Sequence, residues 1–131
     1  MLLLNNLNID KKYQRLLRKH SETENKLKTV LENTIEGICI LDKNLTYTLW
    51  NKSEEKLTAI PKEKVLGKTV IEAFPGFEKT EFYKMYLRIL KSGKPEEMTA
   101  DYTLPNGVTK KFLDRVHPYG DGLIMFVHVI Q

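Results

Sequence analysis

Cysteine is almost missing from this sequence, which has only Cys39 among its 131 residues. A single cysteine excludes an internal disulfide framework and the cysteine cluster of a structural zinc site. The three histidines do not replace it, because they fall in three separate predicted elements without metal-ligand spacing. These residues are His20, His117 and His128. We therefore expect no metal site, and a reducing compartment is compatible with the sequence.

Long hydrophobic runs are also missing. The apolar start Met1–Leu4 is followed by two asparagines, and it has neither a basic flank nor a small-residue cleavage site. A helix that spans a bilayer needs about 20 predominantly apolar residues. We expect no signal peptide, no membrane insertion and a cytoplasmic location.

Basic charge is in modest excess, with a net charge of +4. Residues 1–34 contain seven Lys/Arg against four Asp/Glu, which leaves residues 35–131 nearly neutral, with fourteen against thirteen. A nucleic-acid surface needs basic residues clustered on one face, ideally with aromatic residues that stack on bases. The densest basic run consists of Lys11, Lys12, Arg15, Arg18 and Lys19. We interpret it as a solvated helix face and expect no nucleic-acid binding.

The first predicted element is a helix over residues 10–34, with Asp10 as its N-cap. Its seam residues recur at alternating spacings of four and three, as in a heptad repeat: Tyr13, Leu17, His20, Glu24, Leu27, Leu31 and Thr34. The polar pair in the middle weakens this seam. One interpretation is pairing with a second copy through the candidate dimer residues Tyr13, Leu17, His20, Leu27 and Leu31. The other is packing onto its own domain through Leu16, Leu27, Val30 and Leu31.

After residue 34 the helical period gives way to alternation, which predicts two strands joined by a turn at residues 42–44. The alternating apolar positions are Ile38, Ile40, Leu45, Tyr47 and Leu49. Asn44 is expected to take the left-handed conformation in the turn. Asn51, with Glu54 three residues later, predicts a capping box at the start of a short helix.

Short helical turns are predicted for the middle of the chain. Pro61 opens a turn that Gly67 closes, and Thr69 with Glu72 predicts a second capping box. A longer amphipathic helix follows over residues 79–91. Its apolar positions and its glycine stop are Phe82, Tyr86, Ile89, Leu90 and Gly93.

Three further segments complete the pattern, at residues 96–104, 109–118 and 123–130. The last is so uniformly apolar that we expect it to be a central strand. The sequence therefore predicts an α+β fold, with a five-stranded antiparallel sheet and helices on one face. A doubly wound nucleotide-binding fold would need alternating parallel units and a glycine-rich phosphate turn, and the sequence has neither.

Several short motifs occur in the order and spacing of a known family. They are Glu36-Gly37-Ile38, Trp50-Asn51, Val65-Leu66-Gly67-Lys68, Glu72-Ala73-Phe74-Pro75, Phe82-Tyr83, Ser92-Gly93-Lys94-Pro95 and Asn106-Gly107. Together they resemble a PAS domain over about residues 30–131. The resemblance implies strand order 2-1-5-4-3 and helices that enclose a cavity over one face of the sheet. It also implies an N-terminal signalling helix at 1–34 and a PAS domain at 35–131.

The resemblance is to PAS domains of bacterial and archaeal sensor kinases and related transcriptional activators. It implies a non-catalytic sensory input module whose parent protein carries an output domain, such as a histidine kinase. The family usually closes its last strand with an Asp-Ile-Thr-like triplet. The corresponding triplet is either Val129-Ile130-Gln131 or lies past the end of the sequence. We favour the second interpretation, which makes the chain a fragment of a larger regulator.

Haem and flavin are not expected as cofactors. A haem-binding PAS domain commonly supplies a histidine from its long helix, and residues 79–91 contain none. A flavin photoreceptor of this fold needs a reactive cysteine in the helical region, whereas Cys39 lies in the first predicted strand. We interpret Cys39 as a small buried side chain. An unidentified small ligand is left as the candidate.

Asp114 is the candidate polar group of a ligand site. It shares one side of its strand with Phe112 and Val116, so a charge interrupts that side. If this side lines the cavity, the buried carboxylate would accept hydrogen bonds from a ligand, from Tyr47 or from Trp50. Otherwise Asp114 is exposed and paired with a surface lysine.

The candidate ligand pocket joins Asp114 to the apolar and aromatic residues of the predicted inner face. Its residues are Ile38, Ile40, Tyr47, Trp50, Phe74, Phe82, Tyr86, Phe112, Asp114, Val116 and Met125. Aromatic residues at such spacing are also typical of a plain core, so both interpretations stay open. Arg115 and His117 lie on the opposite side of the strand, where we expect them to face solvent.

Three functions of different classes follow from these features. The leading one is a regulatory input module in which a small ligand or a partner shifts the fold between two arrangements. The alternative is a ligand-free homodimerisation module that pairs through its N-terminal helix and sheet. A stand-alone enzyme is the third, but we expect no nucleophile and no second carboxylate beside Asp114.

Overall fold

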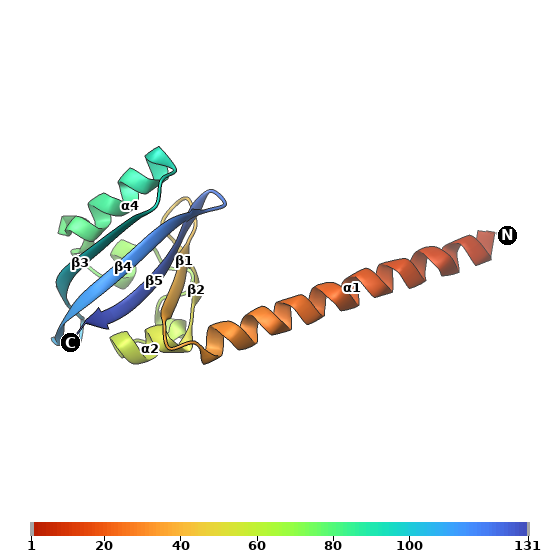
Figure 1. Cartoon of the computed structure of the whole chain (residues 1–131), viewed down its shortest axis with the longest axis horizontal. Coiled ribbons are helices and arrows are strands. Elements are labelled where there is room, and N and C mark those ends of the chain that lie inside the picture. Colours follow the sequence, from red (N-terminus) through yellow and green to blue (C-terminus); the bar gives the residue numbers. More distant parts are fainter. Residues whose placement is uncertain (1, 131) are drawn as a thin grey trace. The chain divides into compact units, whose positions relative to one another are not determined.

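The computed structural model describes the backbone of residues 2–130 and the side chains of residues 11, 12 and 14–130. The chain forms two compact units, Met1–Asn33 and Thr34–Gln131. The first unit is one helix, and the second contains the sheet and the remaining helices (Figure 1). The side chain of Tyr13, from the candidate dimer residues, and Gln131, from the closing triplet, lie outside the described residues.

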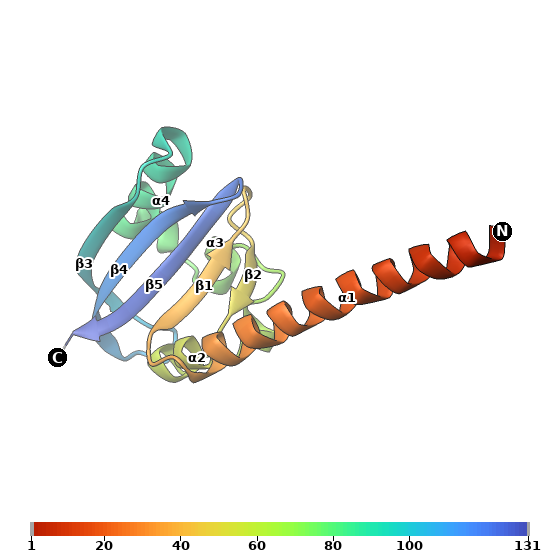
Figure 2. The same cartoon turned by 45° about the vertical axis from the view of Figure 1, so that its right-hand side comes forward.

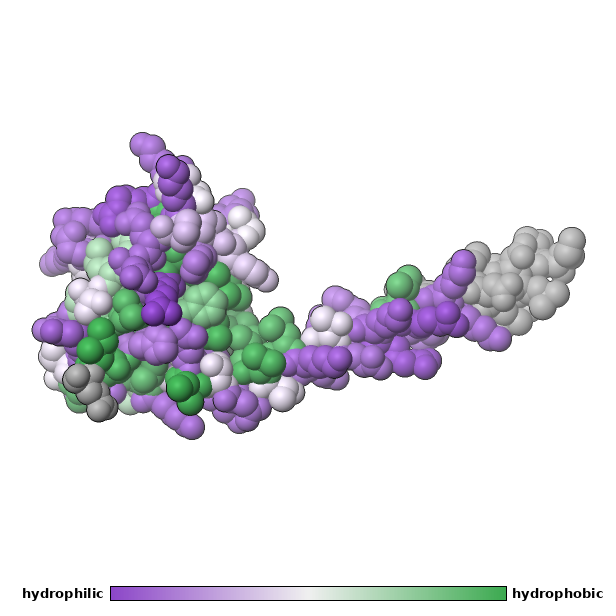
Figure 3. All heavy atoms as spheres, viewed as in Figure 1, coloured by the Kyte–Doolittle hydropathy of each residue, from purple (hydrophilic) through white to green (hydrophobic). Residues whose placement is uncertain are grey.

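Helix α1, Leu2–Asn33, makes up the first unit. It begins well before Asp10, so the predicted N-cap at Asp10 is wrong: the preceding residues already have helical backbone. His20 Nε2 and Glu24 Oε1 lie 2.8 Å apart, one turn from each other. The visible surface of α1 is mostly hydrophilic (Figure 3). Its exposed apolar side chains include Leu16, Leu17, Leu27 and Val30, whereas Leu31 is half-buried.

Five strands form one antiparallel sheet in the second unit. They are β1 Gly37–Leu41, β2 Tyr47–Trp50, β3 Glu96–Thr103, β4 Thr109–Tyr119 and β5 Gly122–Ile130. Their order is β2-β1-β5-β4-β3, as Figure 2 shows. Strand β5 pairs with β1 on one side and β4 on the other, which explains its uniformly apolar sequence. The predicted α+β class, strand order and central last strand are confirmed.

Helices cover one face of this sheet, and Figure 2 shows them behind it. They are α2 Lys52–Thr58, the 3₁₀ turn η1 Lys62–Lys64, α3 Val70–Ala73, the 3₁₀ turn η2 Phe77–Lys79 and α4 Glu81–Ser92. Thr69 and Glu72 form the predicted capping box at the start of α3. Gly93 ends α4 with a φ of 72°, the left-handed conformation that favours glycine.

The turn of the first hairpin differs from the prediction. Leu45 has the positive φ, 59°, and not Asn44. Asp42 accounts for this conformation, because its Oδ1 accepts hydrogen bonds from the backbone N–H groups of Asn44 at 2.8 Å and Thr46 at 3.0 Å. Leu45 therefore belongs to the turn and not to the second strand.

An irregularity in the β1–β2 pairing turns two aromatic residues to the same side. Cys39 pairs with Trp50 and Leu41 with Tyr47, so β2 holds one residue more than β1 between these pairs. Tyr47 and Trp50 are both buried, and their rings meet edge to face with centroids 5.3 Å apart. The bulge thus builds an aromatic wall that strict alternation would have divided between two faces.

The core fills the space between the helices and the inner face of the sheet. Alternate residues of β4 and β5 point into it, and α4 supplies its buried side from above that face. The largest fully buried side chains are Leu41, Val65, Val70, Met85, Ile89, Val116, Leu123 and Met125. All of them belong to the second unit, which therefore has a hydrophobic core of its own.

Asn51 joins the start of β1 to the start of α2. Its Oδ1 accepts hydrogen bonds from the backbone N–H groups of Glu54 at 3.0 Å and Ile38 at 2.9 Å. Its Nδ2 donates to the carbonyl oxygen of Glu36 at 3.0 Å. The predicted cap is confirmed, but Glu54 does not complete a capping box, because the Asn51 N–H donates to the Ile38 carbonyl oxygen. One buried amide therefore fixes two elements.

We predict that Asn51→Ala lowers the free energy of unfolding by about 3 kcal/mol. An ordinary cap contributes about 1 kcal/mol, and here two further buried backbone groups lose their partners. Urea unfolding followed by circular dichroism measures the loss. Thr69→Ala removes an exposed cap and is the matched control, with an expected loss of about 1 kcal/mol. Equal losses in the two variants would contradict the bridging role of Asn51.

Candidate ligand cavity

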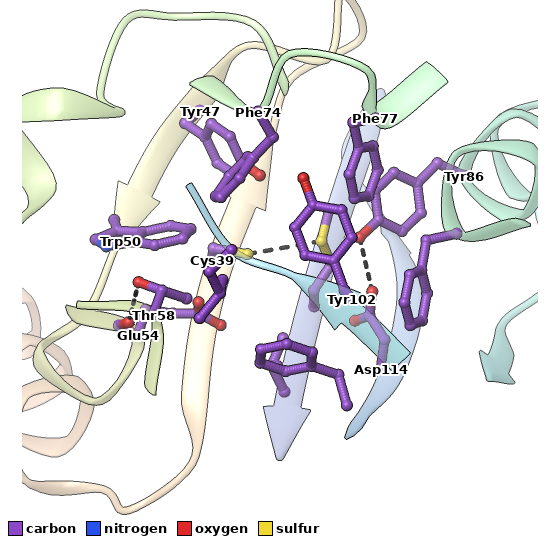
Figure 4. Close-up of a pocket in the computed structure, with 15 residues that line it drawn as sticks. Cys39, Tyr47, Trp50, Glu54, Thr58, Phe74, Phe77, Tyr86, Tyr102 and Asp114 are labelled. Carbon is purple, nitrogen blue, oxygen red and sulfur yellow. Dashed lines mark hydrogen bonds between the residues drawn. The ribbon is translucent and has the colours of Figure 1, made fainter. Parts of the chain in front are cut away.

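A cavity of about 70 Å³ lies between the inner face of the sheet and the helices. Its walls are mainly aromatic, three of the rings being tyrosines, with two carboxyl groups, the hydroxyl group of Thr58 and two sulfur-containing side chains (Figure 4). The lining residues are Cys39, Tyr47, Trp50, Glu54, Thr58, Phe74, Phe77, Phe82, Tyr86, Tyr102, Leu104, Phe112, Asp114, Met125 and Val127. All five strands contribute residues to this lining.

Most of the residues predicted from sequence come together here. Those that line the cavity are Tyr47, Trp50, Phe74, Phe82, Tyr86, Phe112, Asp114 and Met125. Ile38 and Ile40 do not, because Cys39 takes the inward position on β1 and its two neighbours point to the opposite face. Val116 is fully buried in the core, but it lies two residues after Asp114 on β4 and does not line the cavity.

The largest departure from the sequence prediction is Glu54. We expected its side chain at the helix start as a capping partner, and we expected no second carboxylate near Asp114. The structure instead buries Glu54, with 2% of it exposed, in the wall of the same cavity. Gly37 makes room for the Glu54 side chain, because a Cβ at position 37 would lie 2.6 Å from Glu54 Oε1. The Glu36-Gly37 motif was the available signal, but the partner of that glycine is not readable from sequence.

Glu54 Oε1 has no hydrogen-bond partner among the described residues. Burial, and to a smaller extent the nearby negative charge of Asp114, raises the pKa of this carboxyl to about 8. The Thr58 hydroxyl does not satisfy it, since Oγ1 donates to the backbone carbonyl oxygen of Glu54 at 2.6 Å. Near neutral pH this carboxyl is therefore largely protonated.

Asp114 is buried as well, with 4% of it exposed, which excludes the exposed alternative. The Tyr86 hydroxyl donates to its Oδ2 at 2.6 Å, while Oδ1 has no partner among the described residues. Burial raises the pKa of Asp114 to about 7, and the Tyr86 hydrogen bond opposes this effect. Of the donors considered for Asp114, Trp50 is wrong, because its Nε1 donates to the Ile60 carbonyl oxygen at 3.0 Å.

The remaining predictions for this region concern Cys39 and the outer face. Burial raises the pKa of the Cys39 thiol well above its usual value, with further contributions from Glu54 and Asp114, so it is a poor nucleophile. Its Sγ lies 3.6 Å from Met125 Sδ. Arg115 and His117 are exposed on the opposite face of β4, as predicted. The cavity thus has acidic chemistry and no activated nucleophile among its described residues.

A second, larger hollow of about 380 Å³ lies at the surface beside α2 and α3. Its ionisable groups are the exposed side chains of Lys64, Lys68 and Glu72. Glu72 is already engaged in the cap of α3. No buried polar atom without a partner lies in the described wall of this hollow, whereas the inner cavity has two. The inner cavity is therefore the candidate site.

Comparison with protein families decides the identity of the second unit. The PAS fold family matches residues 25–131. The chain belongs to the PAS family. A search of curated proteins finds no match to this PAS domain. In the described residues no helix is long and apolar enough to cross a membrane, and no cluster of His, Cys, Asp or Glu suits a metal ion.

Solved structures share the fold of this PAS domain at low sequence identity. The PAS domain of BvgS from Bordetella pertussis is 23% identical, with a TM-score of 0.67 over 84% of this chain and 88% of that one. A domain of a sensory box sensor histidine kinase/response regulator from Geobacter sulfurreducens is 19% identical, with a TM-score of 0.67 over 83% and 94%. A LOV protein from Rhodobacter sphaeroides is 17% identical, with a TM-score of 0.69 over 84% and 68%.

We predict that this PAS domain loses stability as the pH rises from about 4 to about 8. The folded-state pKa values of Asp114 and Glu54, about 7 and about 8, lie above their ordinary values. The folded state therefore retains protons that the unfolded chain loses from about pH 4 upward, so the free energy of unfolding falls with rising pH. Urea unfolding at about pH 5.5 and about pH 8.5 measures this fall.

Glu54→Gln and Asp114→Asn test the assignment of this pH dependence. Each substitution removes one titrating group, so each should reduce the fall by more than about 1 kcal/mol. The matched controls are Glu55→Gln, the next residue on α2, and Asp101→Asn, an exposed residue of β3. If the controls flatten the profile as much as the buried substitutions do, the assignment is wrong.

Proposed function

We propose that this PAS sensory domain is an input module that binds a small molecule in the inner cavity and relays its presence to an output domain. One observation carries the proposal: two buried carboxyl oxygens in the lining of one cavity, Glu54 Oε1 and Asp114 Oδ1, lack hydrogen-bond partners among the residues that the structure describes. Buried polar atoms without a partner are costly and rare in native proteins. A bound ligand supplies the missing donors.

The size of the cavity favours a small ligand over haem or flavin. Sites for drug-sized molecules and cofactors usually measure about 300–1,000 Å³, several times the volume here. The buried Cys39, with its raised thiol pKa, also speaks against flavin photochemistry at this position. The LOV protein noted above supports a shared fold and not a shared cofactor, because its identity to this chain is only 17%.

The contacts of α2 suggest how occupancy of the cavity is relayed. Glu54 lies three residues after Asn51, whose amide holds Glu36 and Ile38. Ser53, between them, donates from its hydroxyl to the Thr34 carbonyl oxygen. A ligand that moves Glu54 thus acts on the helix turn that holds the segment directly after α1. The ligand shifts the equilibrium by its difference in affinity for the two arrangements.

We further propose that the parent protein is a sensor histidine kinase or a PAS-containing transcriptional regulator. The sensor kinase domain from Geobacter sulfurreducens has the same fold, which supports this proposal at the level of architecture. Catalysis within the PAS domain itself is not proposed. The cavity offers two carboxyls of raised pKa but no activated nucleophile among the described residues.

Filling the cavity should abolish ligand binding. Val127 lines the cavity, and Val129 packs against the same core two residues further along β5 without lining it. We predict that Val127→Phe loses the thermal stabilisation given by hits from a metabolite panel, whereas Val129→Phe keeps it. Native mass spectrometry of the protein as purified, compared with its denatured mass, detects a retained ligand. A panel without any stabilising compound, together with a clean apo mass, would contradict the proposed function.

The alternative is a homodimerisation module that pairs through α1 and the sheet without a ligand. The observation that favours it is the exposure of Leu17 and Leu27 on the heptad seam, at 45% and 57%. An apolar seam of this kind is normally covered by a partner. This function and ligand sensing are compatible, since a ligand may only shift a pairing equilibrium that already exists.

We predict that the chain is a dimer in light scattering and that Leu27→Lys makes it monomeric. The lysine places a charge on the seam that pairing would bury. Thr29→Lys is the matched control. Thr29 is exposed about half a turn away from the seam, so the substitution adds the same charge outside the proposed interface. A monomeric parent chain, or equal weakening by both substitutions, would contradict pairing through α1.

A further inference from the structure

We propose that the ligand of the inner cavity is a small organic cation, an alkylammonium ion or the ammonium end of a short amine. This inference rests on the proposed ligand-binding function and names its chemical class. Its first basis is geometric: Glu54 Oε1 and Asp114 Oδ1 are buried acceptors in the lining of one cavity, and both lack a partner among the described residues. An alkylammonium group offers three N–H donors and a positive charge.

The charge of the lining points in the same direction. Glu54 and Asp114 are the acidic groups of the described wall, and no lysine, arginine or histidine accompanies them there. Lys110 lies on the same strand as Asp114, but its Nζ donates to the Leu57 carbonyl oxygen at 2.8 Å. It does not line the cavity. An anionic ligand would therefore meet two acidic groups without a compensating cation, which disfavours that class wherever either carboxyl is ionised.

The aromatic lining supplies a second, independent attraction for a cation. Figure 4 shows Trp50 and Tyr47 on the side of Glu54, and Tyr86 and Tyr102 on the side of Asp114. Phe74 connects the two groups, with its ring centroid 6.2 Å from that of Trp50 and 6.1 Å from that of Tyr102. The faces of such rings attract cations, most strongly when water is excluded. A neutral ligand would gain hydrogen bonds but not this term.

The volume limits the size of the ion. An apolar cavity of about 150 Å³ holds benzene, with six heavy atoms. By the same ratio, a cavity of about 70 Å³ holds about three heavy atoms, so a four-atom ion lies at the upper limit of its size. Isopropylammonium has four, as do the neutral 2-propanol and the anionic acetate. These three probes match in size and differ in charge.

Because the two carboxyl groups of the cavity are partly protonated near neutral pH, binding of a cation should release protons. The pKa values of Glu54 and Asp114, about 8 and about 7, mean that a cation that pairs with both carboxylates releases protons when it binds at or below neutral pH. The proton leaves to the buffer, and the carboxylate remains paired with the ammonium. The other titratable groups that face the cavity have raised pKa values and stay neutral: Cys39, Tyr47, Tyr86 and Tyr102. They neither donate nor absorb that proton.

The test titrates the full chain with the three probes and follows amide and aromatic NMR shifts. We expect isopropylammonium to bind with a dissociation constant of about 1 mM, and 2-propanol and acetate to bind at least about tenfold more weakly. The affinity for isopropylammonium should rise by about tenfold between about pH 6 and about pH 8, with proton release in calorimetry. Binding of 2-propanol or acetate as tight as that of isopropylammonium would overturn the cation class.

Substitutions locate the site. Glu54→Gln and Asp114→Asn should each weaken isopropylammonium binding at least about tenfold, and Glu55→Gln and Asp101→Asn should leave it unchanged. Circular dichroism confirms that each variant is folded, and proton release by the unmodified chain tests the inference without any variant. If no probe binds while a panel compound still stabilises the chain and Val127→Phe abolishes that effect, this inference fails and the proposed function stands. If no compound of any charge binds, both fail.

Discussion

The fold of the second unit depends on one buried side-chain amide, that of Asn51. It caps α2 through the Glu54 N–H, it accepts from the N–H of Ile38 in β1, and it donates to the Glu36 carbonyl oxygen just before that strand. Backbone groups at a strand entry and a helix start would otherwise be buried without partners. A single residue thus fixes where the sheet begins and where the helical wall of the cavity begins, and it fixes them relative to each other.

The cavity residues include groups that destabilise the folded state of this PAS domain. Two buried carboxyl groups each keep an oxygen without a partner among the described residues, and the direction of their pKa shifts reflects the cost of ionising them. Apolar side chains of similar volume would remove that cost. Elsewhere the described core follows the ordinary rule of satisfied polar groups, as the Trp50 indole and the Tyr86 hydroxyl show. Such a local exception is typical of a site shaped for something other than folding.

Sequence reasoning reached the order of elements, the Thr69 cap, the Asn51 cap and the central last strand, because each depends on a local pattern. It failed where a side chain's direction depends on another segment. Glu54 turns inward because Gly37, seventeen residues earlier, has no side chain, and no local rule couples the two. Tyr47 and Trp50 share a face because of a bulge that alternation cannot express. Ile38 and Ile40 were assigned to the wrong face for a related reason: with both faces of β1 apolar, period-two counting does not choose between them.

The weak heptad seam in α1 is compatible with the regulatory role proposed for the cavity. A fully apolar seam would pair so strongly that a ligand of a few atoms could not alter the equilibrium, since coupling between sites typically amounts to about 1–3 kcal/mol. His20 and Glu24, which contact each other within one helix, occupy two seam positions that would be apolar in a strong coiled coil, so the proposed pairing is expected to be weak. In the proposed function, a small cation that orders Glu54 acts on the turn that holds Thr34 and Glu36, and its binding biases the pairing proposed for α1.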